Sequence, residues 1–576
     1  MLKTRYEIGK VPLSEYPRPQ MRRDSYLCLN GEWSFGKCKI EENIESLSEK
    51  ILVPFSPETE SSGIDEGFLL GNDEKSIYER DFDVDENMLR GATYLHFGAV
   101  DQSCQVFVNG IKVGEHKGGY TPFSFDVSGY LSLGKNTLRV EVTDSTEASS
   151  GARGKQSSKR GGIWYTKQSG IWQTVWLESM PKEHISELKI IPDADKKTVK
   201  IKVDCKGEKR LTVFDNGAEI MRERFDGSEI ELSYDFELWS PENPKLYDFT
   251  IETASGDKVY SYFGVRSFGI GKDEKGIPRL LLNGKPYFLN GVLDQGYWCE
   301  GLLTYPSERA ITDELQMLKD MGFNFIRKHI KIEPMRWYYH CDRLGFVVWQ
   351  DFVNGGGEYK FTHVAAFPFL GFKHKDSDYK YFARENEAGR EEFIASVKET
   401  VDALYNCVSI GGWVPFNEGW GQFDSEMITK MTEELDNSRV IDSVSGWHDQ
   451  GESKTRLRSL HTYYTPLKVP KDSRPVVLSE FGGYSMKVDG HVFCEDKEFG
   501  YKKFHSQEEL VAALRVLYLE KLKPLIKEGL CACVYTQVSD VEEEINGLVT
   551  YDREIIKVPI AEMKAINDEI AKELNS

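Results

Sequence analysis

The chain has 576 residues, of which 40% are hydrophobic and 29% charged, and its formal net charge is −20. This length predicts about two to four domains, and the composition is ordinary for a globular protein. The charge disfavours nucleic acid and anionic membrane surfaces as partners, because both would repel the chain.

The first 180 residues are expected to form a jelly-roll β-sandwich. Short alternating runs dominate this part, and the Asn109-Gly110 pair between two of them is a strong hairpin signal. Residues 145–162 are rich in Ser, Gly, Lys and Arg and predict a flexible loop. The aromatic residues that follow are expected in the sandwich core, with a rim over a neighbouring site as the alternative: Trp164, Tyr165 and Trp172.

Residues 181–270 form a second β segment. Alternation in 198–203 and 247–251 indicates a small sandwich of the immunoglobulin type. The prolines at 241 and 244 exclude a central strand there and predict a turn.

From residue 271 to 576 strands alternate with helices, which predicts an eight-stranded TIM barrel. The expected strands lie near 288–294, 324–330, 346–352, 409–417, 440–446, 459–464, 475–480 and 531–537. The expected helices are 307–321, 388–406, 424–437, 507–527, 558–574 and, more weakly, 333–344. The helices after the fifth and sixth strands are short or missing.

Two of these strands end in a glutamate with a glycine one or two residues later. Glu418 ends the fourth strand and Glu480 the seventh, and both have aromatic neighbours. One such glutamate alone is most often solvated or ion-paired, but two in one barrel favour cleavage of a glycosidic bond. A retaining enzyme would hold them about 5–5.5 Å apart, and an inverting one about 6.5–9.5 Å. At the shorter distance their charges repel, so one keeps its proton and suits a general acid.

These features resemble glycoside hydrolase family 2, which includes β-galactosidases, β-mannosidases and β-glucuronidases. The resemblance covers nearly the whole chain and is carried by segments 29–35, 108–110, 263–266, 282–286 and 322–327. Its most specific part is 406–418, similar in spacing to the family's acid/base signature: Asn406, Ser409-Ile410, Trp413 and Asn417-Glu418. The chain departs from that signature at Cys407, Gly411, Gly412 and Val414.

The resemblance implies a role for several residues. Glu418 would be the acid/base, Glu480 the nucleophile, and Asn417 a ligand of the sugar 2-hydroxyl. Tyr463 looks like the tyrosine that orients the nucleophile. Arg327 could hold that nucleophile ionised, or form a structural ion pair. Further pocket candidates at strand ends are Asp294, His329, Asp351, Trp447, His461 and Gln537.

For each histidine a structural role is the alternative, and for Trp447 a place in the barrel rim. Asp294 and Asp351 are expected to point inward and hold sugar hydroxyls. The long loops 353–387 and 485–505 are expected as lids or site walls.

The expected activity is that of a retaining exo-β-glycosidase acting on terminal β-D-galactosides. The 348–352 stretch, Val-Trp-Gln-Asp-Phe, resembles the β-mannosidase branch and keeps that substrate open. The Asn-x-Lys motif that binds the carboxylate in β-glucuronidases is absent after Glu480, which disfavours that substrate. An arabinosidase is a further alternative, and a non-catalytic carbohydrate-binding protein a remote one.

No metal and no cofactor are expected, and the partner is a carbohydrate substrate; a homo-oligomer stays open. The N-terminus lacks the apolar core of a signal peptide, and no apolar run approaches the ~18 residues of a membrane span. The ten scattered cysteines indicate free thiols in a reducing compartment. We expect a cytoplasmic protein, or a secreted one whose signal peptide lies outside this sequence.

Overall fold

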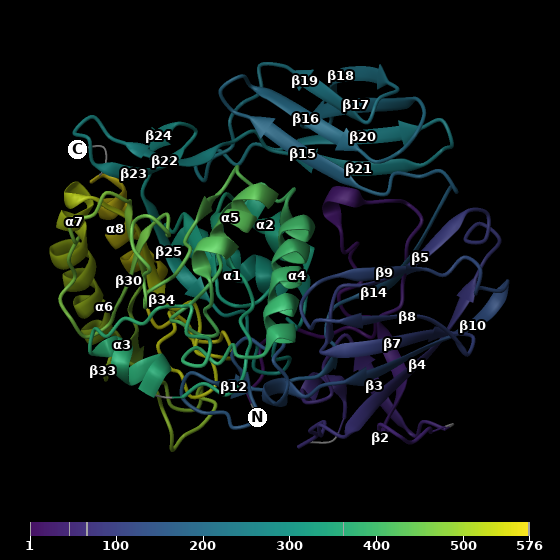
Figure 1. Ribbon diagram of the computed structural model, residues 1–576, viewed down its shortest axis with the longest axis horizontal. Helices are drawn as coiled ribbons and strands as arrows, with labels where there is room; N and C mark the ends of the chain where they lie inside the picture. The colour runs from purple at the N-terminus through teal and green to yellow at the C-terminus, as the bar shows by residue number, and fades with distance from the viewer. Residues whose placement is uncertain (1, 45, 65–66, 361, 574–576) are drawn as a thin grey trace.

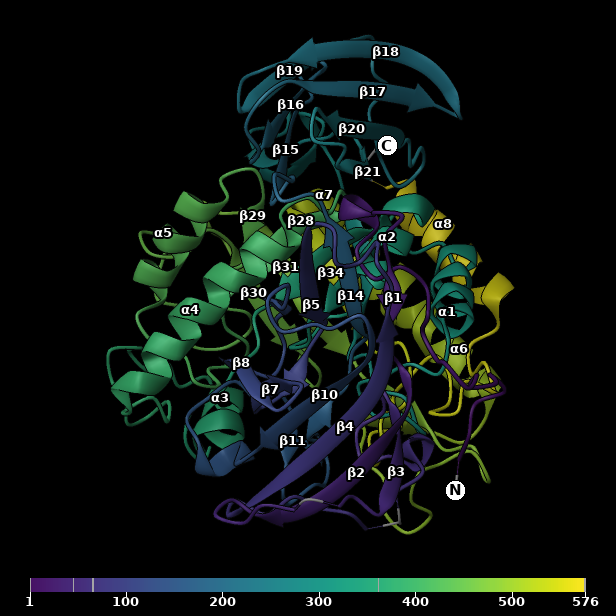
Figure 2. The same cartoon turned by 90° about the vertical axis from the view of Figure 1, so that its right-hand side faces the viewer.

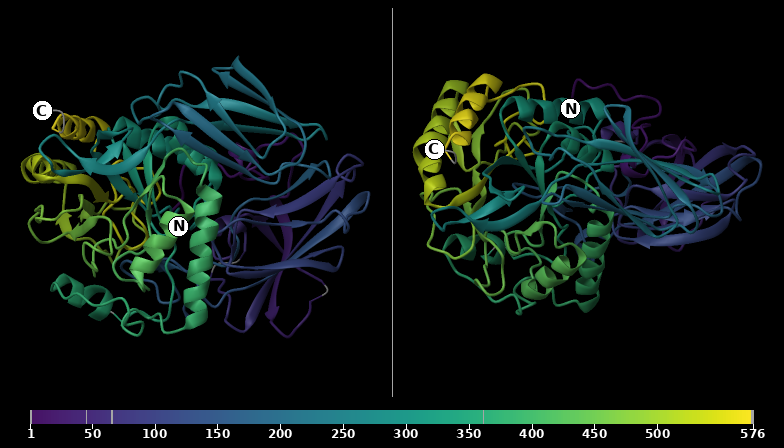
Figure 3. Two further views of the ribbon diagram at one scale, coloured as in Figure 1. Left: turned by 45° about the horizontal axis from the view of Figure 1, so that its top comes forward. Right: turned by 90° about the horizontal axis from the view of Figure 1, so that it is seen from above.

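The computed structural model describes residues 2–44, 46–64, 67–360 and 362–573. Three modules follow one another along the chain (Figure 1). An N-terminal β-sandwich and a smaller β-module lie beside a C-terminal barrel, and the smaller module sits above the sandwich when the molecule is turned (Figure 2). Views from two further sides show both β-modules against the same flank of the barrel (Figure 3).

The N-terminal module consists of two facing antiparallel sheets. In spatial order, the four-stranded sheet contains β1 (Leu27–Cys28), β14 (Val175–Met180), β5 (Ala92–Phe97) and β9 (Phe123–Asp126). The six-stranded sheet contains β3 (Glu49–Val53), β2 (Gly31–Lys39), β4 (Glu74–Val84), β10 (Gly134–Thr143), β7 (Ser103–Val108) and β8 (Ile111–Lys117). Buried residues alternate with half-buried ones, as in β10, so one face of each sheet buries a shared apolar core.

The second module is a seven-stranded sandwich. One sheet contains β15 (Leu188–Asp193), β16 (Thr198–Val203) and β19 (Glu229–Ser233). The other contains β18 (Ala218–Phe225), β17 (Lys209–Asp215), β20 (Tyr247–Thr253) and β21 (Lys258–Phe263). Asn406 joins this module to the barrel, because its side-chain amide accepts from the Ile190 N–H at 2.8 Å and donates to the Leu188 carbonyl at 2.7 Å.

Eight parallel strands form the barrel. Their hydrogen-bonded order is β29 (Val440–Ile441), β28 (Ile410–Val414), β27 (Val347–Asp351), β26 (Phe325–Lys328), β25 (Leu289–Asp294), β34 (Leu530–Thr536), β31 (Val476–Gly482) and β30 (Arg458–Thr462). Each expected strand is present, but the fifth is only two residues long. Pro415 lies just beyond the end of β28, where it removes no ladder hydrogen bond.

All helices except the three-residue α3 (Phe367–Phe369), which belongs to the loop after β27, cover the outer face of the barrel (Figure 1). The covering helices are α1 (Glu308–Asp320), α2 (Met335–Leu344), α4 (Glu387–Leu404), α5 (Ser425–Leu435), α6 (Gln507–Arg515), α7 (Lys523–Glu528) and α8 (Ile560–Ala571). The predicted helix over 507–527 contains a π-helical turn, Val516–Leu522, between α6 and α7. Pro524 follows that turn and has no N–H to continue a regular helix. Between β29 and β31 the described chain contains no helix, as the sequence predicts.

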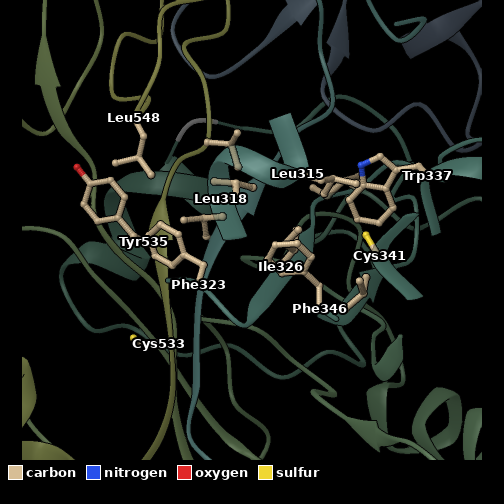
Figure 4. Close-up of a cluster of buried hydrophobic side chains, with 14 of the residues drawn as sticks. Leu315, Leu318, Phe323, Ile326, Trp337, Cys341, Phe346, Cys533, Tyr535 and Leu548 are labelled. Carbon is tan, nitrogen blue, oxygen red and sulfur yellow. The ribbon is translucent and has the colours of Figure 1, made fainter. Parts of the chain in front are cut away.

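One large buried cluster lies between the strands and the helices. It contains Ile326 of β26, Tyr535 of β34, and Leu315 and Trp337 of α1 and α2 (Figure 4). A small sheet of β22 (Phe268–Lys272), β23 (Pro278–Leu282) and β24 (Lys285–Pro286) lies at the opposite barrel end from β12 (Tyr165–Thr166) (Figure 1). None of the described helices is long and apolar enough to cross a bilayer.

The segment 150–166, called here the sandwich loop, is ordered and docked on the barrel, in contrast to the predicted flexible loop. The backbone N–H groups of Arg153 and Gly154 both donate to the Asn354 carbonyl at 3.0 Å. At the other end of the loop, the Thr166 N–H donates to Glu542 at 2.9 Å. Composition alone cannot reveal such docking, because the partner groups lie far away in the sequence.

Candidate active site

Two buried glutamates meet at the carboxyl end of the barrel. Glu418 follows β28 and Glu480 lies in β31. The two residues are 9% and 5% exposed, respectively. A carboxylate oxygen of each and a ring nitrogen of His461 all lie within 4.8 Å of one another. The two carboxyl groups therefore converge on one small region at the carboxyl end of the barrel.

A buried guanidinium connects three of the predicted residues. Arg327, at the end of β26, donates to both oxygens of Asp351 at 2.9 and 3.0 Å. It also donates to Glu480 Oε1 at 3.1 Å and to Asn417 Oδ1 at 2.8 Å. Because Arg327 holds the amide oxygen, the Nδ2 group of Asn417 has a fixed direction, and within the described structure it is buried without a partner. It is therefore available to donate to a ligand.

Histidine and tyrosine side chains complete the surroundings of the carboxylates. His461 Nδ1 lies 2.7 Å from Glu418 Oε1, and its Nε2 lies 3.0 Å from Ser445 Oγ. The Tyr463 hydroxyl donates a short hydrogen bond to Glu480 Oε2. His329 Nδ1 lies 2.8 Å from Asp351 Oδ2. Burial lowers the pKa of His329 well below its ordinary value, so the ring is neutral and donates from this nitrogen.

The two glutamates are electrostatically different. Burial raises the pKa of Glu418 above the ordinary value, and the charge of Glu480 raises it further, against the hydrogen bond from His461. Burial also acts to raise the pKa of Glu480, but the positive charges of His461 and Arg327 outweigh it and the pKa falls below its ordinary value. Glu418 thus retains a proton at a pH where Glu480 is ionised.

The backbone bends sharply to bring these groups together. Glu418 has φ = 50°, a left-handed conformation that costs a non-glycine residue roughly 1–2 kcal/mol. Its N–H donates to the Ser445 carbonyl at 3.0 Å, which holds the bend. Gly446 follows with φ = 82°, and a Cβ there would lie 2.6 Å from the His461 ring. Glycine is required at 446 by both its conformation and this close approach.

Two predicted residues lie outside this cluster. Asp294 accepts from Lys328 Nζ at 2.6 Å, and the Lys328 ammonium lies 4.3 Å from the ring centre of Trp337 in α2. Asp294 therefore faces the layer between sheet and helices, and the expectation that it points inward is corrected. Gln537 is fully buried; its side chain donates to Asn546 at 2.8 Å and accepts from Gln295 at 2.7 Å, and within the described residues no hydrogen bond joins it to either glutamate.

Aromatic side chains wall the remaining sides. The half-buried Trp447 ring lies edge-on to the His461 ring, with 5.5 Å between the ring centres. Tyr501, from the 485–505 loop, stacks on Tyr463 at 3.7 Å between ring centres. The sequence patterns did not single out Tyr501, since its loop has no periodicity that would place it.

The sandwich loop supplies a further wall. The ring centre of Trp164 lies 5.1 Å from that of Trp420 and 5.8 Å from that of Tyr359, so Trp164 belongs to the rim of the site. Tyr165 and Trp172 are fully buried, as expected for core residues. Lys155, in the same loop, lies 5.7 Å from the Trp420 ring centre. Its charge also acts to lower the pKa of Glu418 and that of His329. The basic composition of 145–162 is the only sequence signal for it.

Family models match the chain in three consecutive segments. Residues 56–181 match the sugar-binding domain of glycosyl hydrolases family 2, and residues 275–566 match its TIM barrel domain. Residues 183–270, between them, match a third model of the same family. The chain belongs to glycosyl hydrolase family 2. Membership confirms both the resemblance and the three-part fold class predicted from the sequence.

Family 2 relatives with different named activities are similar to this chain. The β-galactosidase of Thermoanaerobacter pseudethanolicus is 25% identical over 424 residues, which are 67% of this chain and 50% of that protein. The β-D-glucuronidase structure of Dictyoglomus thermophilum covers 97% of this chain and 98% of its own at 16% identity, with a TM-score of 0.74.

An Eisenbergiella tayi β-galacturonidase bound to galacturonate covers 99% of both chains at 18% identity, with a TM-score of 0.68. At such identities the solved structures support the fold alone. The chain spans about half or less of the length of the curated relatives it matches.

Proposed function

We propose that this protein is a retaining exo-β-glycosidase that hydrolyses terminal β-D-galactosides. The observation that carries the proposal is the pair Glu418 and Glu480: one carboxylate oxygen of each lies within 4.8 Å of the other, and their pKa values move in opposite directions. A retaining mechanism needs one protonated and one ionised carboxyl group at about this distance.

In the first step of the proposed reaction, the Glu480 carboxylate attacks the anomeric carbon from the face opposite the leaving group. Glu418 donates its proton to the glycosidic oxygen as that bond breaks, so the aglycone leaves as a neutral alcohol. In the second step Glu418 takes a proton from a water, whose oxygen displaces Glu480 from the sugar. Two inversions retain the β configuration.

The surrounding residues support these steps. Arg327 and Tyr463 hold Glu480 in place and ionised through the contacts described above. The Nδ2 group of Asn417 would donate to the sugar 2-hydroxyl, and Arg327 fixes its direction. His461 joins the two halves of the site, because it contacts Glu418 and lies 3.6 Å from Glu480 Oε1. The galactoside preference has the named activity of the Thermoanaerobacter relative in its favour.

A panel of aryl β-glycosides tests the reaction: galactoside, mannoside, glucoside, glucuronide and arabinoside. We expect turnover of the galactoside, whereas silence across the whole panel would favour a carbohydrate-binding protein without activity. Glu480→Gly should abolish turnover, and azide should restore it with an α-glycosyl azide as product, because azide enters from the vacated face. A β-configured azide would instead assign the acid/base role to Glu480.

A further inference from the structure

The sandwich loop brings a largely buried lysine side chain to the mouth of the barrel. Lys155 is 7% exposed, and its Nζ lies over two rings, 5.2 Å from the centre of Tyr165 and 5.7 Å from that of Trp420. Within the described chain this nitrogen has no hydrogen-bond acceptor and no carboxylate within ion-pair distance. Burying a cation is unfavourable unless an anion or acceptors replace its water shell.

The other buried lysines do not share this situation. Each of them donates Nζ to a carboxylate or carbonyl oxygen: Lys75, Lys167, Lys209, Lys328, Lys331 and Lys557. The contrast is sharpest within the barrel, where Lys328 reaches two carboxylates at 2.6 and 2.8 Å. The fold thus satisfies its buried ammonium groups everywhere described except at Lys155.

The loop holds Lys155 in position from both sides. The neighbouring Arg153 and Gly154 bond the loop after β27 through Asn354, and Arg153 Nη2 reaches the Gly357 carbonyl at 3.0 Å. On the other side, the Tyr165 N–H donates to the Lys155 carbonyl at 3.0 Å. The backbone that carries Lys155 is therefore held against the barrel on both sides.

The surroundings supply no fixed anion for it. Glu418 is the carboxyl group whose pKa its charge affects; that group is already bonded to His461 at 2.7 Å, and burial raises its pKa above the ordinary value. His329, the other affected group, is neutral. An anion that pairs with Lys155 must arrive with the substrate.

We propose that Lys155 is a substrate-binding residue that recognises a carboxylate on the sugar, so that the site prefers β-linked uronic acids over the corresponding neutral sugars. This inference rests on the proposed glycosidase function: it keeps galactosides as substrates but ranks the corresponding galacturonides above them. It also accounts for the absence of the Asn-x-Lys motif after Glu480, because the cation is supplied by another module. An ammonium acts here as a point charge at a desolvated position, with Trp420 as an apolar wall.

The test compares matched 4-nitrophenyl β-galactoside and β-galacturonide, and the corresponding glucoside and glucuronide. Wild-type kcat/KM should be about tenfold or more higher for the acidic member of a pair. Lys155→Met keeps the apolar stem and removes the charge, so it should erase that preference, mainly through KM. Lys155→Arg should restore part of it, and Lys159→Met, an exposed control in the same loop, should leave it unchanged.

Equal losses on acidic and neutral substrates in Lys155→Met, or a wild-type enzyme without acidic preference, would overturn the assignment. Should the protein cleave no glycoside, calorimetry with free D-galacturonate, D-glucuronate and D-galactose separates the two proposals. Acid-selective binding lost in Lys155→Met would support this role while the hydrolase function fails. Equal or absent binding of the acids would refute it.

Discussion

Removal of one hydroxyl group tests the arrangement around the proposed nucleophile. Tyr463→Phe deletes the donor to Glu480 Oε2, and the ring should stay in place because Tyr501 stacks on it at 3.7 Å. A hydrogen bond to a charged group contributes about 1.5–3 kcal/mol. If it acts fully in the transition state, kcat/KM falls about 10- to 150-fold.

The pH profile gives a second reading of the same change. The Tyr463 hydrogen bond helps to lower the pKa of Glu480, so its loss raises that pKa. Since Glu480 must be ionised to attack, the acid limb of kcat/KM should move to higher pH in Tyr463→Phe. Stopped assays with an aryl glycoside across the acid range measure both effects.

Tyr464→Phe is the matched control. It removes a hydroxyl from a ring that also contacts Tyr501, at 5.5 Å, but the residue is 68% exposed. Its profile should match that of the wild type. The reasoning is refuted if Tyr463→Phe keeps kcat/KM within about twofold and leaves the acid limb in place, since a charge-assisted bond is worth more than that.

Two other predictions concern the alkaline limb and the misplaced aspartate. Glu418 must be protonated in the first step, so kcat/KM should fall as pH rises through its raised pKa. In Glu418→Gln, assayed with a dinitrophenyl glycoside whose phenolate leaves without needing a proton, this alkaline limb should disappear. If the limb persists in the variant, the acid is another residue. Asp294→Asn weakens the buried pair with Lys328, so chemical denaturation should show about 3 kcal/mol less stability, while kcat/KM of the folded protein changes by under about twofold. A raised KM at unchanged stability would show that Asp294 binds sugar.

Hydrophobic periodicity accounts for the agreement between predicted and observed barrel elements. The helix predicted over 388–406 is found as Glu387–Leu404, and the strand over 346–352 as Val347–Asp351. The pattern is informative in both cases: α4 has one buried face, which gives a helical repeat of apolar residues, and β27 is buried throughout, which gives a short continuous apolar run. β29 is shorter than the strand predicted over 440–446, because its regular pairing in the sheet ends at Ile441.

Burial on both faces explains why the orientation of Asp294 in β25 could not be read from the sequence. Every residue of β25 is buried, since its inner face meets the barrel interior and its outer face the helices. A strand buried on both faces has no polar side to reveal which residues point inward. Asp351, equally buried, points to the site only because the strand register places it beside Arg327.

Residues supplied by loops were the least predictable part of the candidate site. Arg327, Glu418 and Glu480 could be named because strand ends in a barrel converge, and Asn417 because the chain resembles the family signature. Lys155 lies in another module, and its position depends on backbone contacts to Asn354 that no local pattern encodes. The prediction of a flexible loop rested on composition, which reports on local preference alone.

The strand order has a consequence for synthesis on the ribosome. β25 pairs on one side with β26, which follows it soon in the chain, but on its other side with β34, near the C-terminus. The edge of β25 therefore has no native partner until almost the whole polypeptide has emerged. During that interval an open sheet edge is exposed to other chains, so truncated or stalled products should aggregate more readily than the finished protein.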